Sequence, residues 1–296
     1  MHDALSGKRF FGVTVLNVCI TVLEIIGGLL SGSLALLSDA FHNLGDSLSI
    51  VISYIAHKIS KKSQDSQNTF GYRRAQILAA LLNAALLVFI SLFLIAEAVK
   101  RFSEPETIDG TLMLIVAIVG IVANLISVIL LSRGSHHNMN IKATYLHMMS
   151  DTLSSVGVIL GAVLIKFYGI TIIDPIVTIL VAIYIMFECW PIIKQAINIL
   201  MEGAPSLDYE AIRRDLIQIE GVNDVHHVHA WMVDENSVVF SAHVNMADMC
   251  LSDVEPVYRK IEKLLKSKYQ IAHVTIQAEA SRGEGEKLIY DQGRDI

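Results

Sequence analysis

The pattern of apolar and polar residues divides the chain into two parts near residue 200. Before that point, apolar residues dominate long stretches that are separated by short polar segments. A helix needs about 20 mostly apolar residues to cross a bilayer. Stretches of that length predict six membrane-spanning helices, over residues 10–30, 34–57, 76–98, 110–132, 143–166 and 171–199.

After the Gly203-Ala204-Pro205 break the pattern is that of a small soluble domain. The pattern predicts amphipathic helices at residues 208–219 and 252–268. It predicts strands with alternating apolar residues at 224–233, 237–246 and 271–279. The order αββαβ indicates a ferredoxin-like α+β sheet with helices on one face. The predicted domains are therefore residues 1–203 in the membrane, 204–280 as the αββαβ domain, and 281–296 as a polar, mobile tail.

Composition supports this division. Of 296 residues, 53% are hydrophobic and 18% charged, and the mean hydropathy is +0.52, values typical of a polytopic membrane protein. The formal charge of −6 and the lack of a basic patch argue against nucleic acid as a partner. The three cysteines are scattered, without a Cys-x-x-Cys pair, so we expect them to pack and not to form disulfides.

Loop charges predict the orientation of the membrane domain. One side carries the larger set of basic residues, at Lys8, Arg9, Lys58, Lys61, Lys62, Arg73, Arg74, Arg133 and Lys142. The other side carries Lys100, Arg101 and Lys166. The positive-inside rule makes the first side cytoplasmic. The sequence thus predicts a multi-pass protein of the cell (inner) membrane, with both termini in the cytoplasm.

Two His-x-x-x-Asp tetrads carry the chemistry of the predicted membrane domain. His42 and Asp46 lie in the second apolar stretch, and His147 and Asp151 lie in the fifth. Residues four apart share one helix face, so each helix offers one imidazole and one carboxylate. Together they make a tetrahedral set for a Zn²⁺-like ion. Each pair alone would also be consistent with a satisfied polar contact, but ionisable groups in membrane helices are normally functional.

The chain resembles the cation diffusion facilitator family, most closely its bacterial zinc, cobalt and cadmium resistance branch. The resemblance covers nearly the whole chain. Its most specific stretch is GSLALLSDAFHNLGD at residues 32–46, supported by FGYRRA at 70–75 and HVTIQ at 273–277. It implies a homodimer in the lipid bilayer that exports divalent metal from the cytoplasm in exchange for protons, by alternating access.

The resemblance also assigns sites. The family's transport site falls on both tetrads. A second family site, in the loop after the second helix, retains Asp65 but has Asn68 and Tyr72 where the family has histidines, so it is expected to be absent or reduced. Arg74 and Glu202 match a basic–acidic pair that joins the two domains in relatives.

A third family site lies in the cytosolic domain at the dimer interface. His226, His243 and Glu279 match it, with Gln277 at a further histidine position and His229 as an additional donor. The resemblance implies two roles for zinc. It is the transported ion, and zinc bound at this cytosolic site regulates the protein. These histidines are also consistent with an ordinary strand surface.

Other functions remain open at this stage. Cd²⁺ or Co²⁺ would suit the same ligands, whereas Mn²⁺ or Fe²⁺ is disfavoured because two imidazoles select a softer ion. A membrane receptor that senses metal without moving it would use the same residues. An intramembrane metallohydrolase is disfavoured, because the sequence has no His-Glu-x-x-His and four protein ligands leave no position for a nucleophilic water. We therefore expect a transporter and not an enzyme.

Overall fold

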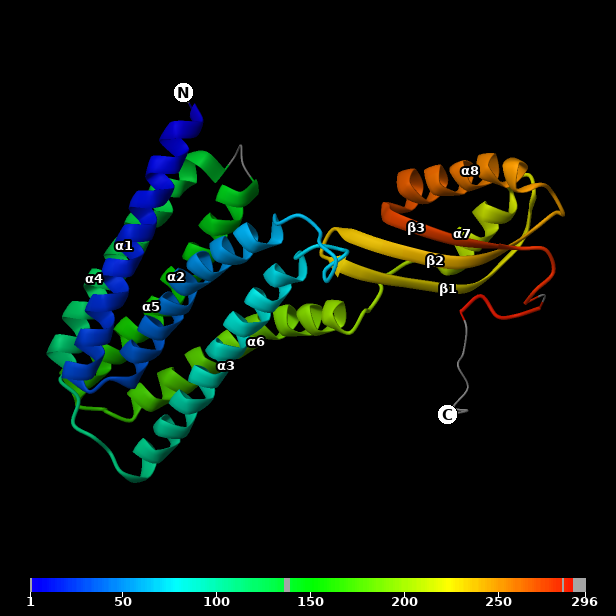
Figure 1. Ribbon diagram of the computed structural model, residues 1–296. Helices are drawn as coiled ribbons and strands as arrows, with labels where there is room; N and C mark the ends of the chain where they lie inside the picture. Colours follow the sequence, from blue (N-terminus) through cyan, green and yellow to red (C-terminus); the bar gives the residue numbers. More distant parts are fainter. Residues whose placement is uncertain (1, 136–138, 284, 290–296) are drawn as a thin grey trace. The chain divides into compact units, whose positions relative to one another are not determined.

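The computed structural model describes the backbone of residues 2–135, 139–283 and 285–289, and the side chains within these ranges except those of residues 2–14, 130–135, 139–150, 153 and 154. The chain begins with six long helices, α1 His2–Ser31, α2 Leu34–Ser60, α3 Arg74–Ser103, α4 Gly110–Ser135, α5 Met139–Tyr168 and α6 Ile173–Leu200. They coincide closely with the six apolar stretches (Figure 1). The predicted helical membrane domain is confirmed.

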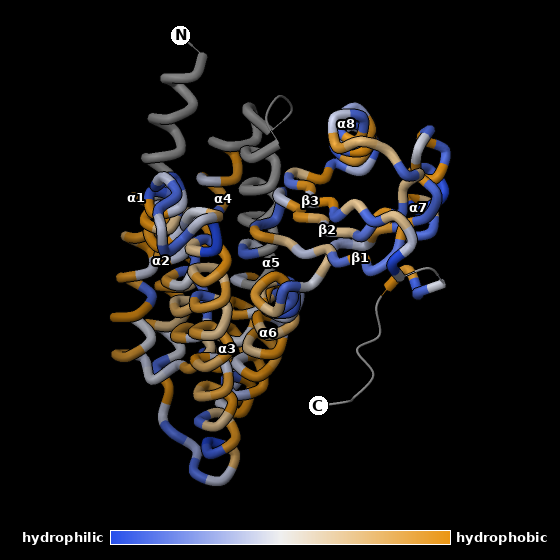
Figure 2. Tube along the Cα trace, turned by 45° about the vertical axis from the view of Figure 1, so that its right-hand side comes forward, coloured by the Kyte–Doolittle hydropathy of each residue, from blue (hydrophilic) through white to orange (hydrophobic). Residues whose placement is uncertain are grey.

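The helices differ in how apolar they are. Among the described residues, α3, α6 and the Gly110–Ile129 part of α4 are long and apolar enough to cross a membrane. The described apolar parts of α1 and α5, Val15–Ser31 and Ser155–Tyr168, are shorter. Figure 2 shows hydrophobic residues along most of α3 and α6. The count of six membrane spans stays a prediction, because α2 carries several polar residues and does not meet the same criterion.

A small α+β domain follows, with α7 Tyr209–Ile217, β1 Val222–Asp234, β2 Ser237–Met246, α8 Leu251–Tyr269 and β3 Ile271–Glu279. The sheet order is β1-β2-β3, with β1 antiparallel and β3 parallel to β2. Figure 1 shows α7 and α8 on one face of this sheet. The core between them contains Phe240 and Val244 of β2 and Ile261 and Leu265 of α8, all fully buried. The predicted αββαβ domain is therefore confirmed.

Contacts divide the chain into two compact units. One comprises residues 1–55 and 79–193, and the other comprises residues 56–78 and 194–296. The second unit thus includes the ends of α2, α3 and α6 together with the α+β domain. The predicted domain boundaries at 203 and 280 stay predictions.

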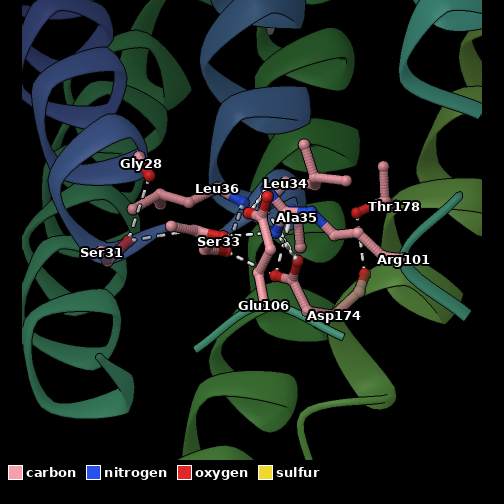
Figure 3. Close-up of polar contacts among 11 residues, drawn as sticks. Gly28, Ser31, Ser33, Leu34, Ala35, Leu36, Arg101, Glu106, Asp174 and Thr178 are labelled. Atoms are coloured by element: carbon pink, nitrogen blue, oxygen red, sulfur yellow. Dashed lines mark hydrogen bonds and ion pairs between the residues drawn. The ribbon is translucent and has the colours of Figure 1, made fainter. Parts of the chain in front are cut away.

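One buried carboxylate organises an end of the helical unit. Asp174, at the start of α6, is fully buried and accepts hydrogen bonds from Ser33 Oγ (2.6 Å) and from the backbone N–H groups of Leu34 (2.8 Å) and Ala35 (3.2 Å). These N–H groups belong to the first turn of α2 and have no partner within their own helix. Arg101 of α3 lies 3.5 Å from the same carboxylate and also donates to the carbonyl of Gly32 (Figure 3). One side chain therefore joins α2, α3 and α6.

Replacing Asp174 with Ala should destabilise the helical unit strongly. The variant loses the cap of α2 and leaves the mostly buried Arg101 without its buried carboxylate partner, a change that costs about 3–5 kcal/mol. Thermal unfolding in detergent should show a midpoint lower by several degrees. Glu106→Ala is the control, because Glu106 also pairs with Arg101 (2.9 Å) but is more than half exposed. Equal midpoints for the two variants would contradict this role of Asp174.

Candidate metal centres

α2 and α5 bring three of the four tetrad residues together. Nε2 of His42 lies 3.2 Å from Oδ1 of Asp151 and 3.9 Å from Oδ2 of Asp46. One possible ligand atom from each residue lies within 4.8 Å of the other two. His42 and Asp151 are buried, and Asp46 is partly buried. We call these three residues the helix cluster. One imidazole nitrogen and two carboxylates at this spacing suit a divalent transition metal.

His147 stands on α5, four residues before Asp151, so the backbone places both on one face of that helix. Its side chain lies outside the described residues. The role of His147 as the fourth ligand therefore stays a prediction.

Buried polar residues surround the helix cluster. Glu24 of α1 is almost fully buried and accepts a hydrogen bond from Nδ2 of Asn43 (2.9 Å), the residue after His42. Asp39 of α2 accepts from Ser155 Oγ of α5 (2.9 Å). Gly120 of α4 gives Glu24 its space, because a Cβ there would overlap the Glu24 carboxylate. A carboxylate in an apolar helix must face protein or water, and Glu24 faces protein. The identity of its partner had no sequence signal.

A second convergence of possible ligands lies on the three-stranded sheet. Oε1 of Glu279 lies 3.1 Å from Nδ1 of His243, and its Oε2 lies 3.3 Å from Nε2 of His226. His226 and His243 are paired neighbours on β1 and β2. We call these three residues the sheet cluster. Together with the helix cluster, it is one of the two groups among the described residues whose ligand atoms lie close enough to hold one ion.

The histidines of the sheet cluster are not an ordinary strand surface. His226 is fully buried, and its Nδ1 has no hydrogen-bond partner among the described residues, while its Nε2 faces the Glu279 carboxylate at 3.3 Å without forming a hydrogen bond. Buried polar groups normally form hydrogen bonds, so this arrangement and the donor set fit a divalent cation. Gln277 donates to Glu279 Oε1 (2.6 Å) and thus lies beside the cluster. His229 is exposed, and its ring contacts His227, outside the three-residue group.

The loop before α3 uses Asp65 as a turn residue. Its carboxylate accepts hydrogen bonds from the N–H groups of Gln67 (2.9 Å) and Asn68 (2.7 Å) and from the hydroxyl of Tyr72 (2.6 Å). The Tyr72 hydrogen bond is the main reason that the pKa of Asp65 lies below its usual value. Asp65 belongs to neither of the two ligand groups found among the described residues. A metal site in this loop thus has no support from the geometry.

Arg74 and Glu202 form the expected pair. Their charged groups lie 3.6 Å apart, and Glu202 is largely exposed. Exposed pairs typically stabilise a protein by about 0–1 kcal/mol, so this contact by itself contributes little to stability.

Comparison with known proteins places this arrangement in a family. A model of the cation efflux transmembrane domain matches residues 11–201, and a model of the cytoplasmic domain of cation efflux proteins matches residues 204–281. The chain belongs to the cation efflux, or cation diffusion facilitator, family. The resemblance inferred from the sequence motifs is therefore confirmed, and the family makes the protein an integral membrane protein of a transporter class.

Several curated relatives match over most of their length. The chain is 42% identical to the cadmium, cobalt and zinc/H(+)-K(+) antiporter of Bacillus subtilis over 296 residues, covering 98% of this chain and 95% of the relative. It is 38% identical to the zinc transporter ZitB of Escherichia coli over 286 residues, covering 96% and 90%. It is 36% identical to the metal cation efflux system protein CzcD of Cupriavidus metallidurans over 259 residues, covering 87% and 82%. These relatives span the zinc, cobalt and cadmium branch of the family.

Replacing both His226 and His243 with Ala should lower the number of zinc ions bound by the purified protein. The double variant removes both imidazoles of the sheet cluster and leaves the helix cluster unchanged. Isothermal titration of the full-length protein in detergent measures the stoichiometry. His229→Ala is the matched control, since it removes an exposed imidazole from the same strand. Unchanged stoichiometry in the double variant would argue that the sheet cluster holds no metal.

Proposed function

We propose that the protein exports zinc from the cytoplasm by exchanging it for protons. The observation that carries this proposal is the helix cluster, in which His42, Asp46 and Asp151 converge from two helices of a membrane domain. The names of relatives support the same substrate class, since they include a zinc transporter and a cadmium, cobalt and zinc antiporter. We further propose a homodimer in the inner membrane with both termini in the cytoplasm. The family's cytoplasmic domain model and the loop charges support this arrangement.

Proton exchange follows from the chemistry of the ligands. Zinc binds neutral imidazole and ionised carboxylate, so protons compete with zinc for the same atoms. A site open to the cytoplasm binds zinc and releases protons. When the site opens to a more acidic exterior, His42, His147 or a carboxylate takes up a proton and zinc leaves. An imidazole is suited to this exchange, because its unperturbed pKa is about 6.5.

The position of the ligands supports alternating access. His42 and Asp46 belong to α2, whereas Asp151 belongs to α5, so relative movement of these helices changes the distance between the ligands. The site lies within the apolar part of the chain, consistent with binding near the bilayer midplane. The sheet cluster has a different role in this proposal, in which bound zinc regulates the protein by favouring one conformation of the dimer.

Two alternatives make different predictions. A metal-sensing receptor would bind zinc at the helix cluster but would move none across a sealed vesicle. An exporter of Mn²⁺ or Fe²⁺ would require a ligand set richer in oxygen than the two predicted imidazoles provide. Cadmium and cobalt are accepted by the same ligands, and we propose them as additional substrates. Zinc flux coupled to proton flux in proteoliposomes separates these possibilities.

Replacing Asp151 with Ala should abolish zinc flux and leave the dimer folded. The substitution removes the carboxylate nearest to His42 and one of the negative charges that balance Zn²⁺. Flux into proteoliposomes and size-exclusion chromatography measure the two effects. Asp65→Ala, which removes an exposed carboxylate in a loop, should transport zinc at the parent rate. Normal flux in the Asp151 variant would disprove the assignment.

Replacing His42 with Asp should retain zinc transport but change its selectivity. The variant keeps a ligand at the same position on α2, but a charged oxygen replaces a neutral nitrogen. A carboxylate binds through one or both oxygens and accepts a wider range of ion sizes. We therefore expect greater relative activity with Cd²⁺ or Mn²⁺.

The pH dependence should change too, because one titrating imidazole is lost. Flux in sealed vesicles for each metal, from about pH 6 to 8 around the imidazole pKa, measures both effects. If the variant keeps the metal ranking and the pH profile of the parent, His42 is not a direct ligand.

A further inference from the structure

The sheet cluster is closed on a side where the sheet has no helix. Residues alternate between the two faces of a strand, and Ala242 and Val244 of β2 pack into the core beneath α7 and α8. His243 therefore lies on the opposite face, and His226 is its paired neighbour. A side chain on this face would ordinarily be in contact with solvent. His226 is nevertheless fully buried, and the Glu279 side chain is 4% exposed.

The cover comes from the chain that follows β3. Residues 281–283 and 285–289, which we call the strap, turn back past β1 (Figure 1). The N–H of Val228 donates to the carbonyl of Leu288 (2.9 Å), and the N–H of His227 donates to that of Lys287 (3.4 Å). The Leu288 side chain packs against the core of the domain. The strap is thus held by backbone hydrogen bonds and by one apolar contact.

The strap meets β1 at an irregularity in that strand. The pairing of β1 with β2 shifts register between His226 and His229, and His227 has a positive φ of 50°. A bulge of this kind leaves backbone groups of an edge strand without ladder partners. The strap carbonyls supply partners for two N–H groups at this point. The local distortion that places His226 in the sheet cluster therefore also makes the docking site for the strap.

Gly283 brings the strap directly against His226. A Cβ built at Gly283 would overlap Nε2 of His226, the nitrogen nearest to Glu279. Gly283 also has a φ of +69°, which an L-residue with a side chain rarely adopts. Only glycine allows the backbone to lie this close to the ring without a displacement of one or the other.

We propose that the strap is a lid on the sheet cluster and that a metal ion enters or leaves this cluster only when the strap moves away from His226. The proposal rests on the regulatory zinc site of the proposed function and adds a control of access to it. The geometry supports it, because the backbone at Gly283 lies against Nε2 of His226, whereas the His243 side chain of the same cluster is about a quarter exposed. Among the described residues, two backbone hydrogen bonds and the Leu288 side chain hold the strap to the domain, so its release costs little compared with unfolding the domain.

Zinc release from the full-length protein tests this proposal. The Asp151→Ala background removes the contribution of the helix cluster, and a chromogenic chelator in excess reports the release rate. Release should be about tenfold faster in Gly283→Ala and in a chain that ends at Ala280, since the strap hydrogen bonds are weakened or lost. Gly285→Ala is the matched control. Gly285 also has a positive φ, of +85°, but its added Cβ would meet no atom within 4 Å, so release should stay at the parent rate.

Hydrogen exchange gives a readout that is independent of metal. The amides of His227 and Val228 should be protected in the metal-free parent and should lose protection in Gly283→Ala and in the truncated chain. Equal release rates in the parent, Gly283→Ala and the truncated chain would overturn the lid, as would unprotected amides in the parent. If His243→Ala leaves the zinc stoichiometry of this background unchanged, the cluster holds no zinc. That result overturns the regulatory site and its lid together, while zinc flux by the parent still tests the transport proposal separately.

Discussion

The constraint on which this structure depends is the cost of placing carboxylates among apolar helices. An isolated charge there is expensive, so each buried carboxylate needs donors or an opposite charge. The charge of Asp174 is compensated by fixed groups, because Arg101 and three hydrogen-bond donors at the start of α2 surround its carboxylate. The charge of Asp151 is compensated in a variable way, because its neighbour His42 carries a positive charge only when protonated. The first arrangement fixes the helices, whereas the second changes its charge balance whenever a proton or a metal ion binds.

The two clusters have similar ligands, but the backbone elements that carry these ligands differ in rigidity. In the helix cluster, His42 and Asp46 share a helix face, and Asp151 comes from another helix, so a shift between α2 and α5 changes the site. In the sheet cluster, paired strands fix the spacing of His226 and His243 through the backbone ladder. Helices can slide or tilt against each other at modest cost, but a strand cannot slip by one residue without turning its side chains to the other face. A pair of helices therefore suits a site that must open and close, and a pair of strands suits a site that must hold an ion in a fixed place.

Much of this organisation could be predicted from the sequence, because it follows from periodicity and spacing. The six helices, the αββαβ order and the pairing of His42 with Asp151 all result from apolar length, alternation and the i, i+4 repeat. The contacts of Glu24 with Asn43 and of Asp174 with the start of α2 could not be predicted, since they join residues far apart in sequence without a repeating pattern. Arg101 is an instructive case, because a loop charge that indicated orientation is in fact mostly buried beside Asp174. His229 was expected to add a donor to the sheet cluster, but its ring contacts His227 and lies outside the ligand group.

The strap matters for regulation only if its position depends on the metal. A ligand shifts a conformational equilibrium by no more than its difference in affinity for the two states. Nε2 of His226 faces both Glu279 and the backbone at Gly283. In the lid proposal, an ion bound to this nitrogen lies next to the strap, so the fit of the strap to β1 depends on whether the ion is there. If the lid proposal holds, the contact that closes the site also gives the closed and open states different affinities for metal. This difference is the physical requirement for a domain whose tail reports the occupancy of a buried site.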